Sequence, residues 1–401
     1  MNPRDPFRWT IEAGQDLAAK GLLRMRRQVV PLPRGRCRLV TEQGESPVLW
    51  NFASNDYLGL AEDPRLNAAA EEATAECGTG ARASALVTGR TIWHARLEQR
   101  LAEFKQTPAA LLFPTGFAAN VGTICGLVGP GDVVLCDRWN HASLVDGCRL
   151  SGAKLRVYPH GDVATVEREL DKALDARRRL IVTDSLFSMD GDVAPLRELA
   201  HLAEQHDAML LVDEAHATGV FGDRGTGLLE ACGVESPHVI AVGTLSKALG
   251  SQGGFICGPK SVIDWLGNSA RTQVYSTALT PGACGAALAA LDIIDREPQR
   301  RTWLAERSAE IKRILTAAGW NVPSAVAGPI IPIIVGSNDH VTALAEALLH
   351  ASCMVAAIRP PTVPRDTARL RISLNFAGGE GGITTLLDAL KFANRPPRST
   401  P

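Results

Sequence analysis

His238-Val-Ile-Ala-Val242 is a short apolar run, and Gly243-Thr-Leu-Ser-Lys-Ala-Leu-Gly250 follows it directly. The first segment has the length and composition of a buried strand. The second is a short turn bounded by glycines, in which Lys247 lies close to the hydroxyls of Thr244 and Ser246. Burial lowers the pKa of a lysine amine and favours its attack on a carbonyl carbon. The segment therefore predicts a reactive lysine at a strand end, with hydroxyls suited to binding a phosphate.

Lysine is scarce in this chain of 401 residues, so any chemistry that requires an amine has few candidates. The eight lysines are at positions 20, 105, 154, 172, 247, 260, 312 and 391. Most lysines in proteins are solvated surface charges. We expect the same of the seven lysines other than Lys247.

The segment belongs to a longer alternation of short apolar runs and helical stretches, between about residues 60 and 290. Runs typical of buried strands occupy 109–113, 132–136, 180–183, 208–212 and 238–242, and helical patterns cover 164–178 and 196–206. This alternation predicts an α/β fold with a mostly parallel sheet covered by helices on both faces. The run at 253–257 follows after too short a turn for a helical crossover, so we expect it to be antiparallel.

The pattern differs on either side of this region, which suggests three parts. Residues 1–60 form an N-terminal arm with a helix at 11–27, and residues 61–290 form a large domain. Residues 291–401 form a smaller C-terminal α+β domain, with expected helices at 300–318 and 341–350 and strands at 330–335 and 370–374.

Composition excludes several classes of protein. The formal net charge of −1 argues against a nucleic-acid binder, which needs excess basic charge. No uncharged apolar run reaches the roughly 18 residues of a membrane-spanning helix, and the N-terminus has no secretory signal. The nine cysteines lack Cys-x-x-Cys spacing, and the nine histidines lack metal-ligand spacing. We therefore expect a cytoplasmic protein with free thiols and no metal.

Polar residues follow the other expected strands, and ligands of parallel sheets bind at these carboxyl ends. Asp213 and His216 follow the run at 208–212, and His141 follows the run at 132–136. Gly116 and Phe117 open a helix after the run at 109–113, where backbone amides can bind a phosphate. Taken singly, Asp213 is as well explained as a helix cap or salt bridge, and His141 as a solvated loop residue.

Together these residues match the requirements of one cofactor, pyridoxal 5'-phosphate (PLP). PLP needs a lysine, an anion beside its pyridine nitrogen, phosphate donors and a planar group over the ring. Lys247 can be the lysine and Asp213 the anion. The phosphate donors can be Gly116 and Phe117 with Thr244, and the planar group can be His141.

The motifs also resemble those of the α-oxoamine synthase family of fold-type-I PLP enzymes, from about Asn51 to Leu374. The resemblance is carried by the segments Asn55-Asp-Tyr-Leu-Gly-Leu60, Thr115-Gly-Phe-Ala-Ala-Asn120, Asn140-His-Ala-Ser-Leu144, Phe187-Ser-Met-Asp-Gly-Asp192, Asp213-Glu-Ala-His-Ala-Thr-Gly219 and Thr244-Leu-Ser-Lys247.

The resemblance implies a role for each matching residue. Lys247 would bind the cofactor and move the substrate α-proton. His141 would stack on the pyridine ring, Asp213 would pair with its nitrogen, and His216 would bond its phenolic oxygen. Further cofactor contacts are implied for Gly116, Phe117, Ser188, Thr244 and Ser246. In a homodimer with a shared active site, Ser276, Thr277 and Thr362 would reach the neighbouring subunit's phosphate. Substrate contacts are implied for Arg24, Asn55, Ser84, Thr362 and Arg371, of which Arg371 would bind the amino-acid carboxylate.

Segments 358–364 and 368–374 resemble the family members that condense L-alanine with pimeloyl-CoA in biotin synthesis. Family members that use glycine with acetyl-CoA, or other amino acids and thioesters, share the core motifs. An aminotransferase is the alternative from another class. The family often has Gly-Gly-Ser followed by a basic residue, whereas here Gly80-Ala-Arg-Ala-Ser-Ala-Leu86 places Arg82 before Ser84. This departure affects the expected acyl-chain specificity.

Overall fold

The computed structural model describes residues 5–323 and 326–393, which divide into two units by their internal contacts. The large unit comprises residues 55–306 and 326–329, and the small unit comprises the described residues of 1–54, 307–325 and 330–401. The boundary at residue 306 falls within a helix, α12 (Gln299–Ala317). The three-part division expected from the sequence stays a prediction.

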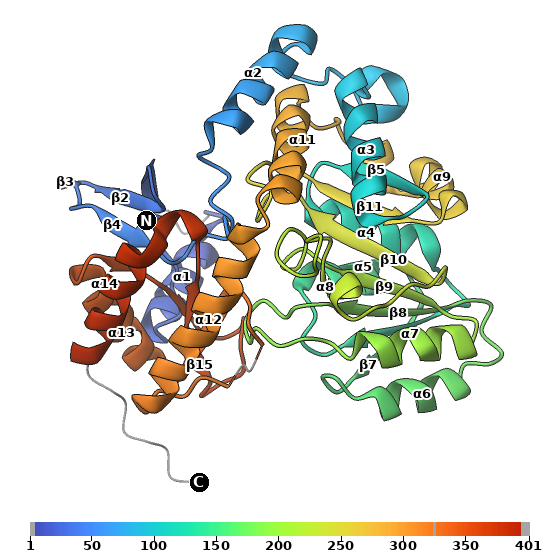
Figure 1. The fold of residues 1–401 in the computed structure, drawn as a ribbon. Coiled ribbons are helices and arrows are strands. Elements are labelled where there is room, and N and C mark those ends of the chain that lie inside the picture. The colour runs from blue at the N-terminus through green and yellow to red at the C-terminus, as the bar shows by residue number, and fades with distance from the viewer. Residues whose placement is uncertain (1–4, 324–325, 394–401) are drawn as a thin grey trace. The chain divides into compact units, whose positions relative to one another are not determined.

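The large unit is built around a seven-stranded sheet with the order β5-β11-β10-β9-β8-β6-β7 (Figure 1). Every pairing is parallel except those of β11, which runs antiparallel to both β10 and β5. The strands are β5 (Ala109–Phe113), β6 (Val133–Asp137), β7 (Lys154–Tyr158), β8 (Arg179–Asp184), β9 (Met209–Asp213), β10 (Val239–Thr244) and β11 (Gly254–Gly258). The α/β fold class and the antiparallel strand are confirmed. Strand β7, at the sheet edge, was not expected from the sequence.

Helices cover both faces of this sheet. The face carrying Val182, Leu211 and Val242 is buried under α4 (Gly116–Leu127), α5 (Ala142–Leu150) and α9 (Lys260–Ser269). Complete burial of each such apolar side chain contributes about 1.5–3 kcal/mol. On the other face lie α3 (Ile92–Lys105), α6 (Val163–Asp171) and α7 (Leu196–Gln205) (Figure 1). The remaining helical elements of the unit are α2 (Pro64–Cys77), the π-helical turn η1 (Ala85–Gly89), α8 (Leu228–Ala231), α10 (Arg271–Val274) and α11 (Pro281–Arg296).

The small unit contains two further sheets. One has the order β1-β2-β4-β13, with β3 paired to β2, and the other has the order β12-β15-β14. The strands are β1 (Gln28–Leu32), β2 (Arg36–Thr41), β3 (Gly44–Glu45), β4 (Leu49–Asn51), β12 (Ile330–Gly336), β13 (Cys353–Met354), β14 (Ala356–Ile358) and β15 (Ala368–Ser373). The helices are α1 (Arg8–Ala19), α13 (Asn338–His350), the 3-10 turn η2 (Phe376–Gly378) and α14 (Gly379–Phe392).

The expected helix at 11–27 is wrong in its extent. Helix α1 ends at Ala19, and Gly21 then adopts a positive φ of 62°. Residues 28–32 form β1, in which Pro31 is tolerated because β1 is an edge strand. The helix expected at 164–178 is likewise shorter, since α6 ends at Asp171.

No helix in residues 5–323 and 326–393 combines the length and apolarity needed to cross a membrane.

Candidate active site

Six strands of the large sheet point the same way, so their carboxyl ends meet along one edge. Residues that the sequence predicts for the site follow five of them, with polar side chains after four and the backbone amides of Gly116 and Phe117 after the fifth. Gly116 and Phe117 follow β5, His141 follows β6, and Ser188 follows β8. Asp213 is the last residue of β9, and His216 comes shortly after it. Thr244 is the last residue of β10, and Ser246 and Lys247 come shortly after it. Because a parallel sheet is a rigid frame, these side chains start from fixed positions.

Lys247 and His216 are in direct contact. The Lys247 Nζ atom lies 2.8 Å from His216 Nε2, and His216 Nδ1 lies 2.6 Å from the Tyr57 hydroxyl. Tyr57 also donates to Asn55 Oδ1 at 3.2 Å. Since that oxygen only accepts, the Tyr57 oxygen is available to accept from a protonated Nδ1. With this tautomer, His216 Nε2 accepts from the Lys247 amine.

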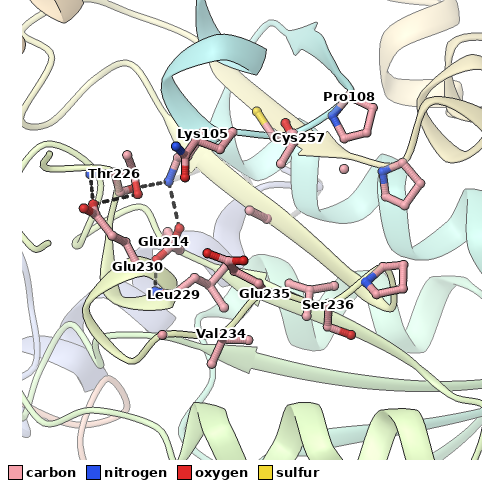
Figure 2. Close-up of a pocket in the computed structure, with 18 of the residues that line it drawn as sticks. Lys105, Pro108, Glu214, Thr226, Leu229, Glu230, Val234, Glu235, Ser236 and Cys257 are labelled. Carbon is pink, nitrogen blue, oxygen red and sulfur yellow. Dashed lines mark hydrogen bonds and ion pairs between the residues drawn. The ribbon is translucent and has the colours of Figure 1, made fainter.

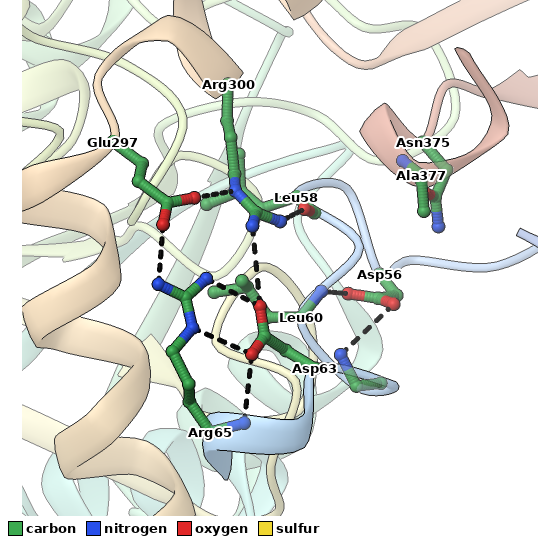
Figure 3. Close-up of polar contacts among 10 residues, drawn as sticks. Asp56, Leu58, Leu60, Asp63, Arg65, Glu297, Arg300, Asn375 and Ala377 are labelled. Carbon is green, nitrogen blue, oxygen red and sulfur yellow. Dashed lines mark hydrogen bonds and ion pairs between the residues drawn. The ribbon is translucent and has the colours of Figure 1, made fainter. Parts of the chain in front are cut away.

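A charged network holds the segment that carries Asn55 and Tyr57 (Figure 3). Arg300 donates to the Leu58 carbonyl at 2.8 Å and pairs with Glu297 at 2.7 Å. Arg65 links Glu297 to Asp63 at 2.5 and 2.7 Å. The network joins the start of α2 to the start of α12, and it thereby restrains the position of Tyr57 beside His216.

Asp213 is 5% exposed and is bound on both carboxylate oxygens. Oδ2 accepts from Asn120 Nδ2 at 2.6 Å, and Oδ1 accepts from the Ala215 amide at 2.8 Å. Asn120 also donates to Ser143 Oγ at 2.9 Å, which lies 2.7 Å from His141 Nδ1. A line of hydrogen bonds thus connects Asp213 with His141. Sequence reasoning did not assign Asn120, Ser143 or Tyr57 to the site.

Hydroxyls and backbone amides come together near the carboxyl ends of β5 and β10 and form a candidate phosphate cradle. The Thr244 hydroxyl lies 2.8 Å from that of Ser246 and donates to the Gly253 carbonyl at 2.9 Å. A Cβ on Gly116 would lie 3.3 Å from Thr244 Cβ, so any larger residue would crowd this space. The Thr115 side chain accepts a hydrogen bond from the Ala118 amide, the third amide of α4. The first two amides of a helix have no hydrogen-bond acceptor within the helix. These are the amides of Gly116 and Phe117.

Gly254 sets how closely the two sides of this cradle approach each other. A Cβ at this position would lie 2.3 Å from the Thr115 carbonyl oxygen and 2.6 Å from the Gly116 amide nitrogen. Both are backbone atoms, so neither can move aside cheaply.

Two other predicted residues are neighbours in the large unit. Ser84 and Thr277 form an isolated antiparallel bridge, and the Ala278 amide donates to the Ala83 carbonyl at 3.1 Å. The loop with the altered motif is therefore tied to the loop of Ser276 and Thr277. Arg82, with a positive φ of 66°, donates to the Cys77 carbonyl at the end of α2. Its guanidinium is thereby engaged with α2.

The small unit brings together two of its three predicted residues. Arg24 donates to Thr362 Oγ1 at 2.9 Å. Arg371, on β15, is 5% exposed and donates to Ser373 Oγ at 2.8 Å. A buried guanidinium on a strand is a strong site for a carboxylate, because it presents its donors in a fixed plane.

A separate cavity of about 440 Å³ lies on the side of the sheet covered by α3 (Figure 2). Lys105 reaches into it with a side chain that is 3% exposed, and it pairs with Glu214 at 2.7 Å. It also donates to Thr218 Oγ1 at 2.9 Å and to the Thr226 carbonyl. The expectation that every lysine except Lys247 is a surface charge is thus wrong for Lys105. It is wrong for Lys312 as well, whose burial lowers its pKa to about 8.

Comparison with known proteins agrees with this arrangement. The aminotransferase class I and II family matches residues 47–390. The 8-amino-7-oxononanoate synthase of Anaeromyxobacter dehalogenans (strain 2CP-1) is 46% identical over 387 residues, which is 96% of each chain. Among solved structures, SPT (serine palmitoyltransferase) with PLP has a TM-score of 0.88 at 28% identity, covering 98% of each chain. An 8-amino-7-oxononanoate synthase from Francisella tularensis has a TM-score of 0.73 at 27% identity, covering 86% of this chain and 98% of that one.

The chain therefore belongs to the aminotransferase class I and II family of fold-type-I PLP enzymes. Within it, the chain is a PLP-dependent acyltransferase of the 8-amino-7-oxononanoate synthase group. The resemblance to α-oxoamine synthases and the PLP expectation are confirmed.

The residues present fit this cofactor. The glycine-lined cradle with its hydroxyls and amides suits a phosphate, and the ionisable Asp213 suits a pyridinium nitrogen. Lys247 lies at the end of the neighbouring strand, and His141 is linked to Asp213 through Asn120 and Ser143.

Proposed function

We propose that the chain catalyses the decarboxylative condensation of L-alanine with pimeloyl-CoA, a 6-carboxyhexanoyl thioester. The products are 8-amino-7-oxononanoate, CO2 and CoA, in biotin biosynthesis. The observation that carries this proposal is the pair of anchored groups, Asp213 bound by Asn120 and Lys247 bound by His216, in a chain 46% identical to these synthases over nearly its full length.

When bound, PLP supplies an electron sink that stabilises a carbanion at the amino-acid α-carbon. We assign the Asp213 carboxylate to its pyridine nitrogen, since Asn120 and the Ala215 amide hold both carboxylate oxygens by donation. Lys247 binds the cofactor and then moves the α-proton. His216, which contacts Tyr57 through Nδ1, orients the Lys247 amine through Nε2.

The other predicted residues take supporting roles in this proposal. His141 covers the cofactor ring and Ser188 lies beside it. Gly116, Phe117, Thr244 and Ser246 bind the phosphate. Arg371 binds the amino-acid carboxylate, and Arg24, Asn55, Ser84 and Thr362 contact the substrates. The burial of Asp213 and His216, 5% and 6% exposed, excludes water from these two side chains and strengthens their interactions.

We also propose a cytoplasmic homodimer in which Ser276 and Thr277 reach the partner subunit's phosphate. The apolar side chains of Phe117 and Tyr275, 49% and 73% exposed, flank these loops and support a covered surface. Light scattering on a sizing column distinguishes this dimer from a monomer.

The test of the activity is release of free thiol from pimeloyl-CoA by the yellow, PLP-loaded protein. We expect release only when alanine is present. Thiol release from acetyl-CoA with glycine instead refutes the alanine assignment in favour of another α-oxoamine synthase, and amino-group exchange without thiol release indicates an aminotransferase. Lys247→Ala removes the essential amine and should abolish turnover, whereas Lys154→Ala, at an exposed position on β7, should leave it unchanged.

A further inference from the structure

Three loops of the large unit meet at the ring of His160, which follows β7. Its Nδ1 lies 3.1 Å from Asp137 Oδ1, at the end of β6, and its Nε2 lies 2.6 Å from Asp192 Oδ2, in the loop after β8. Trp139 stacks on the ring at a centroid distance of 4.1 Å and an interplanar angle of 18°. Phe187 meets it edge-on at 4.3 Å and 89°.

These contacts require a charged ring. An ionised carboxylate only accepts hydrogen bonds, so two carboxylate partners need a proton on both ring nitrogens. Burial lowers the pKa of His160, but the hydrogen bonds and charges of Asp137 and Asp192 outweigh it and raise the pKa to about 9. Trp139 and Phe187, which pack on the ring, carry no titratable group, and the face of the stacked Trp139 indole favours a cation.

On one side, the imidazolium fixes the turn that leads to His141. Asp137 accepts from the Trp139 amide at 2.8 Å and from the Gly161 amide at 2.9 Å, and its backbone carbonyl accepts from the Asn140 amide at 3.2 Å. The turn ends at His141, whose own amide donates to Asp184 Oδ2 at 2.7 Å. A shift of Asp137 would therefore move His141.

On the other side, His160 holds the closed loop that carries Ser188. The Phe187 amide donates to the Asp192 carbonyl at 2.9 Å, the Gly191 amide donates to the Phe187 carbonyl at 2.8 Å, and Leu186 bridges Val193. Ser188 lies within this loop, directly after Phe187, whose ring touches His160.

We propose that His160, as an imidazolium between Asp137 and Asp192, is a positioning residue that fixes the His141 turn relative to the Ser188 loop. It thereby sets the orientation of the imidazole that covers the cofactor ring. The inference rests on the proposed roles of His141 and Ser188, and His160 itself touches neither substrate nor cofactor.

The test compares His160→Phe with a matched control, His238→Phe. His238 lies just before β10, at the amino end of an interior strand, and its ring nitrogen Nδ1 bonds the backbone carbonyl of Ala208. For each PLP-loaded protein we would measure the visible circular dichroism per bound PLP, kcat, both KM values and the thermal midpoint. In His160→Phe we expect an altered dichroism band and kcat lowered about 10- to 100-fold, with KM for pimeloyl-CoA within about twofold. His238→Phe should match the wild type in dichroism and kcat.

If His160→Phe lowers only the thermal midpoint, with wild-type dichroism and kcat per bound PLP, the residue is merely structural and the proposal is wrong.

If that variant does not fold, Asp192→Asn replaces it, because this change keeps the ring and its stacking. Losing one carboxylate lowers the pKa of His160, so the alkaline fall of kcat should move to lower pH, and Asp192→Glu should restore it. If the alkaline fall of kcat in Asp192→Asn occurs at the same pH as in the wild type, the proposal is wrong. The dichroism signal depends only on bound PLP, so it tests the positioning role of His160 independently of activity. A wild-type protein that is inactive toward pimeloyl-CoA would refute the proposed function and leave the dichroism test intact.

Discussion

The buried pair of Lys105 and Glu214 provides a quantitative test of the fold around the site. Replacing Lys105 by Met removes the ammonium group and keeps a side chain of similar length. Among the described residues, Glu214, whose side chain is 1% exposed, would then keep the Leu229 amide as its donor, at 2.9 Å, and lose the Lys105 ammonium. Thr218 Oγ1 and the Thr226 carbonyl would also lose their donor.

The expected cost follows from this loss of partners. Breaking a buried ion pair by removing one partner destabilises a protein by about 3–5 kcal/mol, because the remaining charge stays buried. We therefore expect Lys105→Met to lower the free energy of unfolding of the cofactor-free protein by about that amount in urea denaturation. Glu214 directly follows Asp213, so PLP affinity should fall as well.

The matched control is Lys260→Met, which breaks the exposed pair of Lys260 with Asp264, 70% and 61% exposed. Such a pair contributes about 0–1 kcal/mol. The double variant Lys105→Met/Glu214→Gln removes the unpaired charge, so it should recover part of the loss. A cost for Lys105→Met no greater than that of Lys260→Met would refute the reasoning.

Three further predictions concern the site and its surroundings. Asp213→Asn should still fold, but kcat for thiol release should fall by at least about 100-fold, because the charge that holds the pyridine nitrogen protonated is lost; a smaller loss would contradict the assigned role. Asn120→Leu removes the donor to Asp213 and to Ser143, so PLP should dissociate more readily, as a titration of apoprotein would show. The pKa of His160 is raised from 6.5 to about 9 by folding, so its contribution to stability, at most about 3 kcal/mol, is full below pH 6.5 and is lost as the pH rises through 9. Thermal midpoints of wild type and His160→Phe should therefore converge above pH 9, and a constant difference would contradict this.

The large sheet was predictable because its strands are continuous apolar runs separated by amphipathic helices. The rule that ligands bind at strand carboxyl ends then located Asp213, His141 and Lys247 along one edge without any coordinates. The same reasoning missed β7, whose residues are mostly half-buried or exposed and therefore lack an apolar run. It also missed the N-terminal sheet, in which β4 pairs with β13 some 300 residues away, at Trp50 and Cys353.

The supporting residues of the site were harder to foresee, for a physical reason. Asn120 lies within α4 and Tyr57 in an irregular segment, so their partners depend on how the chain packs. Lys105 was expected to be a surface charge because a buried lysine is costly unless a carboxylate meets it. Glu214, more than 100 residues later, supplies that carboxylate.

The close approach at Gly254 has a consequence for anyone who wants to redesign the enzyme. A side chain there would be pushed into the backbone of Thr115 and Gly116, so we expect random mutagenesis at this position to yield destabilised proteins. A library aimed at new acyl donors should keep Gly116 and Gly254 constant. Its diversity belongs in the Arg82–Ser84 loop, where two consecutive side chains, Ala83 and Ser84, are only half-buried and the surrounding strands need not move.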